Sequence, residues 1–113
     1  MVKIEILESL YEEIEDTFKQ DSLDIFNLID SLKDSPKKGK PLGSVGGILI
    51  KELKYKNYRF YFLTDGYKLK FMREEDLLDL LFRFVRMSNK KYQQETINEI
   101  KHILKTLGPE GFK

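Results

Sequence analysis

The hydrophobic residues of this chain change their spacing about a third of the way along it, and that change restricts the possible folds. Early in the chain, apolar residues recur every three or four positions, as on one face of a helix: Leu7, Leu10, Tyr11, Ile14, Phe18, Ile25, Phe26, Ile29 and Leu32. The segment Ser35–Pro41 breaks this pattern. Beyond it, Ile48–Lys54 and Tyr58–Thr64 have the composition and alternation of two antiparallel strands. The switch predicts an α+β fold.

Shorter patterns complete the first half of the predicted fold. Apolar residues alternate with charged ones over residues 2–6, which predicts a short first strand. Asp21 or Ser22 can cap the second helix. Because a short link joins the two helices, we expect an antiparallel helical hairpin covering one face of the sheet. The glycines up to Gly47 extend the basic loop Ser35–Pro41.

The second half is predicted to be mainly strand. Asp65-Gly66 is typical of a tight hairpin turn and predicts a strand over residues 67–72. Arg73–Asp76 is polar and indicates a loop or one helical turn. The apolar segment Leu78–Met87 predicts a central strand, and helical spacing then returns up to Gly108-Pro109. We therefore expect one domain over residues 1–113, with two N-terminal helices packed on a twisted antiparallel sheet of about four strands, and a C-terminal helix.

The composition excludes several kinds of chemistry. The chain has no Cys and one His, His102, so thiol chemistry and Ser-His-Asp or Cys-His sets are not expected. Asp76 and Asp79, three residues apart, are a weak pattern for a metal ion. No apolar run is long enough to span a membrane, and the N-terminus lacks the layout of a signal peptide. These observations predict a cytoplasmic protein that needs no metal or other cofactor.

Charge is unevenly distributed along the chain. The formal net charge is +1, but residues 1–35 contain three Lys and ten acidic residues, whereas residues 36–113 contain 17 Lys or Arg and nine acidic residues. Such a division favours a basic working surface backed by an acidic one. The alternative is a sequence rich in Lys and Glu wherever the surface allows, with no functional meaning.

Two basic segments lie on neighbouring predicted strands. Arg59 is surrounded by aromatic residues in the first, Arg83 and Arg86 bracket the second, and Asn89–Tyr92 follows closely. Guanidinium groups set among β-forming aromatics predict a rigid anion-binding surface. Arg83 and Arg86 point to opposite faces of a regular strand, so they can share one cleft only across a bulge. Arg59 has a plainer alternative, which is an ion pair with an acid such as Glu52.

Cations of this kind suit RNA cleavage without a metal ion. In that reaction the 2′-hydroxyl attacks the adjacent phosphate, and the protein must stabilise a phosphorane and manage two protons. Arg supplies permanent charge for the first task. Tyr92 or a Lys could serve the second, because Lys90 and Lys91 would favour the tyrosinate. Interleaved aromatic rings also suit single-stranded RNA, whose bases stack on them.

Several short motifs follow the two helices in a characteristic order: Lys40-Pro41-Leu42, Ile50-Lys51-Glu52-Leu53-Lys54, Tyr58-Arg59-Phe60-Tyr61-Phe62, Asp65-Gly66 and Phe84-Val85-Arg86-Met87-Ser88-Asn89-Lys90. Together they resemble the RelE/ParE toxin superfamily, and most closely its HigB-type branch, over nearly the whole chain. The resemblance implies the toxin of a type II toxin–antitoxin system, a metal-independent and ribosome-dependent mRNA endoribonuclease. Its implied partners are a cognate antitoxin protein, mRNA and the ribosome, with no membrane and no small-molecule cofactor.

The resemblance also implies roles for individual residues. Arg59 falls where the family has a strand Arg that contacts the scissile phosphate. Arg86 matches the basic residue after the last strand, and Tyr92 matches a C-terminal Tyr that some members use in proton transfer. Lys54 and Lys90 match further basic positions, which completes the expected catalytic set. The expected RNA contacts are Lys38, Lys40, Lys51, Lys91 and Arg83.

Three features depart from the family pattern. Phe82 stands where the HigB branch often has a His, Met72–Leu77 lengthens the expected hairpin, and the net charge of +1 is low for a toxin directed at the ribosome. Two other functions therefore stay open. One is a non-enzymatic toxin of the ParE type, a branch that acts on DNA gyrase, and the other is an inactivated family member that acts by binding protein.

Overall fold

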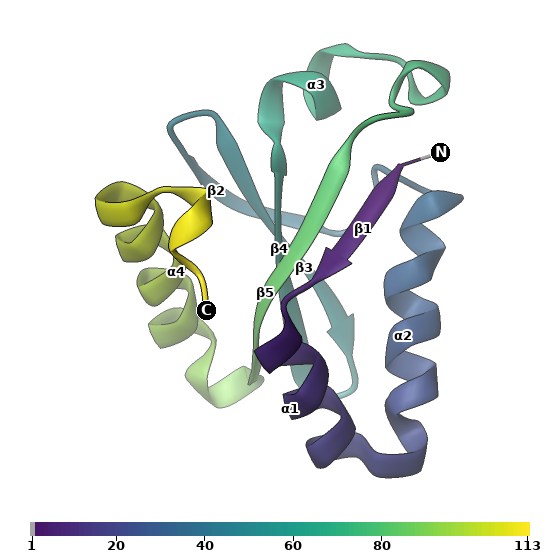
Figure 1. Ribbon diagram of the computed structural model, residues 1–113, viewed down its shortest axis with the longest axis vertical. Coiled ribbons are helices and arrows are strands. Elements are labelled where there is room, and N and C mark those ends of the chain that lie inside the picture. Colours follow the sequence, from purple (N-terminus) through teal and green to yellow (C-terminus); the bar gives the residue numbers. More distant parts are fainter. Residues whose placement is uncertain (1) are drawn as a thin grey trace.

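The computed structural model describes residues 2–113 and contains, within that range, a five-stranded sheet with helices on both faces (Figure 1). The strands lie in the order β1-β5-β4-β3-β2, and neighbours are antiparallel except β1 and β5, which are parallel. The strands are β1 (Lys3–Ile6), β2 (Lys40–Val45), β3 (Ile48–Tyr55), β4 (Tyr58–Asp65) and β5 (Leu81–Asn89). The helices are α1 (Glu8–Phe18), α2 (Ser22–Asp30), α3 (Gly66–Phe71) and α4 (Gln93–Leu107). Single 3-10 turns are η1 (Lys19–Asp21), η2 (Ser31–Lys33), η3 (Glu74–Asp76), η4 (Lys90–Tyr92) and η5 (Pro109–Gly111).

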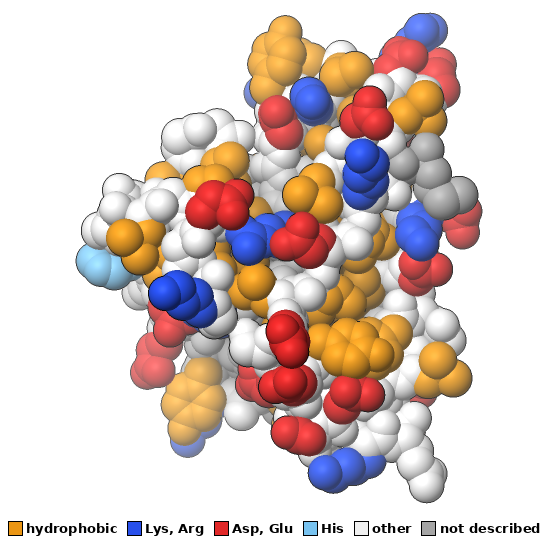
Figure 2. All heavy atoms as spheres, viewed as in Figure 1, with side chains coloured by type: hydrophobic (Ala, Val, Ile, Leu, Met, Phe, Trp, Pro, Cys, Tyr) orange, Lys and Arg blue, Asp and Glu red, His pale blue; other side chains and the backbone are white. Residues whose placement is uncertain are grey.

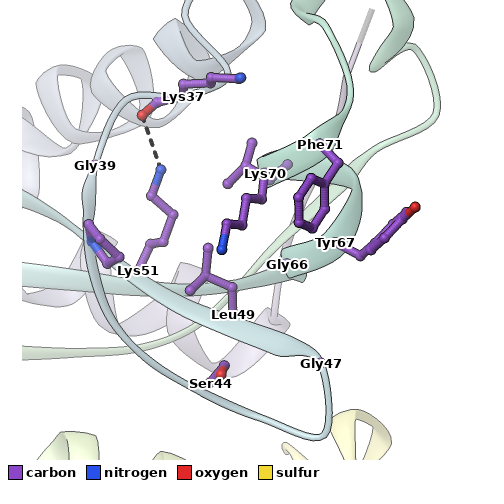
Figure 3. A pocket seen from close by; sticks show the side chains of 12 residues that line it. Lys37, Gly39, Ser44, Gly47, Leu49, Lys51, Gly66, Tyr67, Lys70 and Phe71 are labelled. Carbon is purple, nitrogen blue, oxygen red and sulfur yellow. Dashed lines mark hydrogen bonds between the residues drawn. The ribbon is translucent and has the colours of Figure 1, made fainter.

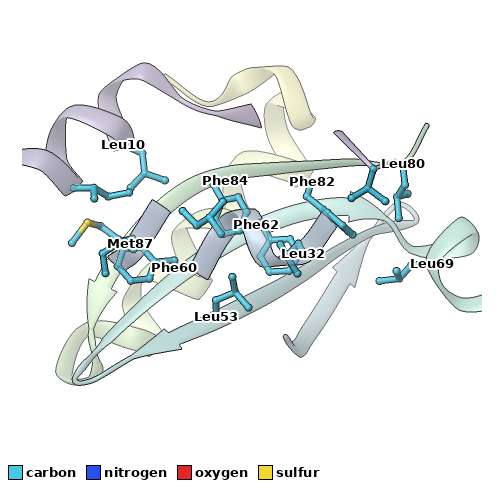
Figure 4. Packing of buried hydrophobic residues seen from close by; sticks show 14 of the residues in the cluster. Leu10, Leu32, Leu53, Phe60, Phe62, Leu69, Leu80, Phe82, Phe84 and Met87 are labelled. Atoms are coloured by element: carbon cyan, nitrogen blue, oxygen red, sulfur yellow. The ribbon is translucent and has the colours of Figure 1, made fainter. Parts of the chain in front are cut away.

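Helices α1 and α2 form the expected hairpin and cover one face of the sheet (Figure 1). Tyr11 of α1 and Phe26 of α2 stack with their ring centroids 4.6 Å apart. Beneath them, phenylalanine rings of β4 and β5 form the centre of this core (Figure 4). Phe62 lies 4.7 Å from Phe84 and 5.4 Å from Phe82, between ring centroids. Contacts of this kind add to the free energy of burial.

The predicted capping role of Asp21 or Ser22 is wrong. Asp21 is the N-cap residue of α2, but its side chain accepts no hydrogen bond, because its backbone is already helical rather than extended. The Ser22 side chain is buried, and its hydroxyl donates to the carbonyl of Ile14 at 3.2 Å. A 3-10 turn thus joins α1 to α2, and Ser22 fastens one helix to the other.

Helix α4 covers the opposite face of the sheet. Its buried residues Ile97, Ile100 and Leu104 pack against β3, β4 and β5, and Phe112 closes the end of this second core. The helix ends as predicted at Gly108, whose φ of 75° is in the left-handed region and whose N–H donates to the carbonyls of Ile103 and Leu104. The sheet is therefore the middle of three layers.

Two segments differ from prediction. The glycine-containing stretch after Ser35–Pro41 is not all loop, because residues 40–45 form the edge strand β2, where Pro41 is tolerated. The predicted strand over residues 67–72 is wrong, because that segment is helix α3. The side chain of Asp65 accepts a hydrogen bond from the N–H of Lys68, so Asp65 caps a helix instead of opening a hairpin turn.

These two changes cancel in number, because segment 67–72 does not contribute a strand and β2 does. The sheet has five strands instead of about four because the short predicted strand at the N-terminus, β1, also joins it, parallel to β5 at one edge. Strand β5 starts at Leu81 rather than Leu78. The polar segment Arg73–Asp76 contains the 3-10 turn η3, which is the helical alternative of its prediction.

A β-bulge in β5 decides where the basic residues point. Tyr61 pairs with Arg86 and Phe62 pairs with Phe84, so Val85 is an extra residue on β5. Because of this extra residue, Arg86 and Arg83 point to the same face of the sheet, the one that α4 covers. The sequence required a bulge for Arg83 and Arg86 to share a face, and that bulge is present.

Candidate functional site

Four of the residues predicted to carry function, Lys40, Lys54, Arg59 and Arg86, lie on the α4 face of the sheet, in two neighbouring cross-strand rows. The first row consists of Lys40, Glu52, Tyr61 and Arg86, on four successive strands. The second consists of Lys54, Arg59 and Ser88. Cross-strand partners point to the same side of a sheet, so these seven residues form one surface, called here the polar strip.

Arg59 is buried beneath this surface. Only 5% of the residue is exposed, and one of its terminal nitrogens donates to the carbonyls of Tyr58, at 3.0 Å, and Lys56, at 3.4 Å. Its Nε lies 3.9 Å from a carboxylate oxygen of Glu52, and the other carboxylate oxygen accepts a hydrogen bond from Gln93 at the start of α4. The ion pair with Glu52, which was the plainer alternative for Arg59, is present. At this burial the Arg59 guanidinium is closed to a phosphate in this structure.

Arg86 and Arg83 also have acidic partners, but nearer the surface. Arg86 donates from Nε to Glu99 of α4 at 2.6 Å, and its guanidinium carbon lies 5.2 Å from the centre of the Phe112 ring. Partial burial raises the pKa of the Glu13 carboxyl, and the nearby charge of Arg86 opposes that shift. Arg83 donates to Glu5 of β1 at 2.9 Å and to the carbonyl of Pro109. Arg83 thus ties the edge strand and the C-terminal segment to β5.

Tyr61 and Ser88 are members of the polar strip that the sequence did not single out. Their hydroxyl oxygens are 2.8 Å apart, and burial raises the pKa of the Tyr61 phenol above its ordinary value. Tyr61 therefore stays protonated at neutral pH. Strand alternation in the sequence could have identified Tyr61, because residues two apart on a strand, such as Arg59 and Tyr61, point to the same face.

Three exposed lysines lie at one end of the polar strip, where β3 and β5 end and β4 begins (Figure 1). We call Lys54, Lys90, Lys91 and Tyr92 the lysine corner. The N–H of Lys90 donates to the carbonyl of Asn57 at 2.8 Å, and the side chain of Asn89 accepts from the N–H of Tyr92 at 3.2 Å. Both bonds hold the turn that presents these residues, and Tyr92 is 47% exposed.

Charge at the lysine corner is not neutralised within residues 2–113. None of its three lysines forms a salt bridge there, in contrast to the three arginines described above. The ammonium of Lys91 lies 5.5 Å from the centre of the Tyr92 ring. Acidic side chains instead gather over α1, as Figure 2 shows for one face of the molecule.

The remaining predicted RNA contacts are divided between the two faces. Lys40 belongs to the polar strip and is exposed. Lys51 points to the opposite face, where it is buried and donates to the carbonyls of Lys37 and Lys38. The side chain of Lys38 donates a hydrogen bond to the hydroxyl of Ser31, which follows the last residue of α2. The structure therefore does not bring Lys38 and Lys51 together with the other predicted residues.

Neither a metal cluster nor a membrane span is found in the described part of the chain. No group of three or more His, Cys, Asp or Glu side chains there is arranged to hold a metal ion. His102 is exposed on α4. No helix within residues 2–113 is long and apolar enough to cross a membrane.

Comparison with known proteins gives no match: no family model, no curated protein and no solved structure is similar to this chain. The likeness to the RelE/ParE superfamily therefore rests on the motifs in the sequence.

Proposed function

We propose that this protein is the toxin of a type II toxin–antitoxin system and that it cleaves mRNA without a metal ion, in the cytoplasm and on the ribosome. The observation that carries the proposal is the lysine corner at the end of the polar strip, where three lysines that form no salt bridge within residues 2–113 stand beside an exposed phenol. Single-stranded RNA suits a surface of this kind, because its phosphates bind cations and its unpaired bases stack on aromatic rings.

In this reaction the 2′-oxygen of a nucleotide attacks its own 3′-phosphate and the 5′-oxygen of the next nucleotide leaves. The products are a 2′,3′-cyclic phosphate and a new 5′-hydroxyl end. Lys54 and Lys90 hold the phosphate, and Lys91 adds positive charge. The 2′-oxygen loses a proton and the leaving 5′-oxygen gains one; Tyr92 exchanges one of these protons and solvent exchanges the other.

Of the two arginines expected at the phosphate, Arg86 is the less buried and its ion pair is the less costly to separate. Separating the partly exposed pair Arg86–Glu99 costs about 0.2–1 kcal/mol, less than the roughly 1.5–3 kcal/mol of a hydrogen bond to a charged group. Breaking the buried pair Arg59–Glu52 costs about 3–5 kcal/mol, which one phosphate contact does not offset. Arg86 thus exchanges its ion pair with Glu99 for one with the phosphate. Arg59 keeps its ion pair with Glu52 and contributes only the electrostatic potential of its buried positive charge.

The test is a reconstituted translation system with a reporter mRNA, read by mapping 5′-hydroxyl ends. We expect cleavage by the wild type and a loss of about tenfold or more for Arg86→Gln and for Lys90→Ala, since each removes one contact to a charged group. Arg73→Gln is the matched control, because Arg73 is exposed and paired away from the polar strip. Intact reporter, or equal losses in all three variants, would exclude this function.

A second candidate is a toxin that acts by binding protein, as in the ParE branch. It is favoured by one observation, that Arg59, Arg83 and Arg86 all have carboxylate partners within residues 2–113. It predicts gyrase-linked DNA breaks and a co-purifying topoisomerase subunit, with intact mRNA. A culture induced to express the protein, examined for both DNA breaks and 5′-hydroxyl mRNA ends, therefore distinguishes the two candidates.

Under either candidate the partner is an antitoxin with an amphipathic, acidic segment. That segment covers the lysine corner or lies against the helical hairpin of α1 and α2. Its gene is expected beside this one, as a short reading frame with a DNA-binding motif. Co-expression of that product should abolish toxicity and yield a stable complex. Toxicity that persists at equal expression would contradict the assignment of that product as the antitoxin.

A further inference from the structure

A second polar feature lies on the opposite face of the sheet, where a cavity of about 690 Å³ opens between the β2–β3 hairpin and α3 (Figure 3). A volume of this size is in the range of small-molecule sites. The cavity has an apolar floor that includes Leu49, and aromatic residues of α3 line its wall. It shares no residue with the polar strip.

The charge of the cavity is entirely positive. Three lysines line it, Lys37, Lys51 and Lys70, and no Asp or Glu is among the described residues around it. Figure 3 shows the Lys70 side chain reaching from α3 into the cavity toward Leu49. The Lys70 ammonium lies 5.3 Å from the centre of the Phe71 ring. No salt bridge joins Lys51 or Lys70 to a carboxylate within residues 2–113.

Lys51 is the unusual member of this group, because it is only 3% exposed. Its ammonium donates to the carbonyls of Lys37 and Lys38 at 3.1 and 3.0 Å, which accounts for two of its three N–H groups. The ring of Phe62 lies 5.9 Å away. Burial lowers the pKa of Lys51, as expected for an ammonium without a counter-ion. A buried cation of this kind is costly, and an anion bound beside it would offset that cost.

Two exposed aromatic residues stand at the edge of the same cavity. Tyr67 is 69% and Phe71 64% exposed, although their side chains are large and apolar. Their ring centroids are 4.9 Å apart, and Figure 3 shows the rings side by side on α3. Exposed apolar surface next to unpaired cations fits a ligand that has a planar apolar part and an anionic group.

We propose that this cavity binds a small organic anion, with a planar apolar body against Phe71 and Leu49 and a carboxylate or phosphate between Lys51 and Lys70. The plainer role of Lys51, pinning the loop at Lys37 and Lys38, explains its two hydrogen bonds. It does not explain Lys70, which enters the cavity from another element, or the absence of acidic residues around the opening.

The experiment is a titration followed by ¹H–¹⁵N NMR, with benzoate and phenyl phosphate as probes and benzamide as the neutral control. We expect saturable shifts of the amide signals of Gly47, Lys51 and Phe71 with at least one of the anions, and binding of benzamide weaker by about fivefold or more. The anion that binds more tightly identifies the charged group of the natural ligand.

The informative variant is Lys70→Gln, because Lys70 is exposed and its loss should leave the fold intact. We expect about threefold to fivefold weaker binding of the anion. Lys68→Gln, on the same short helix but outside this cavity, is the matched control and should bind as the wild type does. Equal affinity for benzoate and benzamide, shifts scattered over the surface, or equal effects of the two variants would overturn the proposal.

Discussion

The buried ion pair between Arg59 and Glu52 should be one of the larger electrostatic contributions to stability in this protein. At 3.9 Å the two charges attract by about 4 kcal/mol if the effective dielectric constant is about 20. Glu52→Gln keeps an oxygen for Gln93 but leaves the Arg59 charge buried without a counter-charge. We expect a loss of about 3–5 kcal/mol in the free energy of unfolding, a large part of the roughly 5–15 kcal/mol of an ordinary domain.

The measurement is urea unfolding followed by circular dichroism, on Glu52→Gln, Arg59→Met and the double variant. The double variant should be less destabilised than the sum of the single variants by about 2–3 kcal/mol, because removing both charges leaves neither unpaired. Glu99→Gln is the control, since its pair with Arg86 is partly exposed, and it should lose less than about 1 kcal/mol. Additive losses, or an effect of Glu52→Gln no larger than that of the control, would refute the reasoning.

Three further predictions concern single features of the fold. Asp65→Ala should lower the free energy of unfolding by about 1 kcal/mol through loss of the α3 cap, measured by urea unfolding, and an unchanged midpoint would contradict that cap. Replacing both Lys90 and Lys91 with Ala should reduce the salt dependence of single-stranded RNA binding, with the slope of log K against log salt falling by about 1.4 in fluorescence anisotropy; an unchanged slope would place the RNA elsewhere. Since burial raises the pKa of Tyr61, the unfolded chain releases that proton first, so stability should fall as pH rises above about 10. Tyr61→Phe should lessen that fall, and an identical pH profile would show that Tyr61 does not cause it.

The secondary structure was most predictable where the hydrophobic pattern is long and has one period. The hairpin of α1 and α2, strands β3 and β4, and helix α4 all follow from such patterns. Prediction was wrong at Asp65-Gly66, because the same dipeptide can open a hairpin turn or cap a helix. The choice depends on whether residues 67–72 find a strand to pair with. Strand β4 has no free edge for them, because it lies between β5 and β3.

The candidate site was predictable in residue type but not in accessibility. Sequence reasoning selected five residues as one group, and the structure places Arg86, Arg59 and Lys54 in adjacent rows of the same face. The other two are Lys90 and Tyr92. Arg59 is buried by tertiary contacts, and Gln93 of α4 reaches its partner Glu52 only after the chain has turned at η4. Ionic partners distant in sequence, such as Arg83 and Glu5, are set by the pairing of β1 with β5.

The sequence by itself determined the α+β class and most of the apolar side chains that face the core, because the spacing of apolar residues at period 2 or 3.6 is a local property of the chain. Tertiary structure alone decided which cations are free to meet a ligand. The bulge at Val85 turns Arg86 toward α4, where Glu99 neutralises it, while the lysines at the end of β3 and in η4 stay exposed. Burial and pairing of charge depend on contacts between residues far apart in the sequence, which no local pattern encodes.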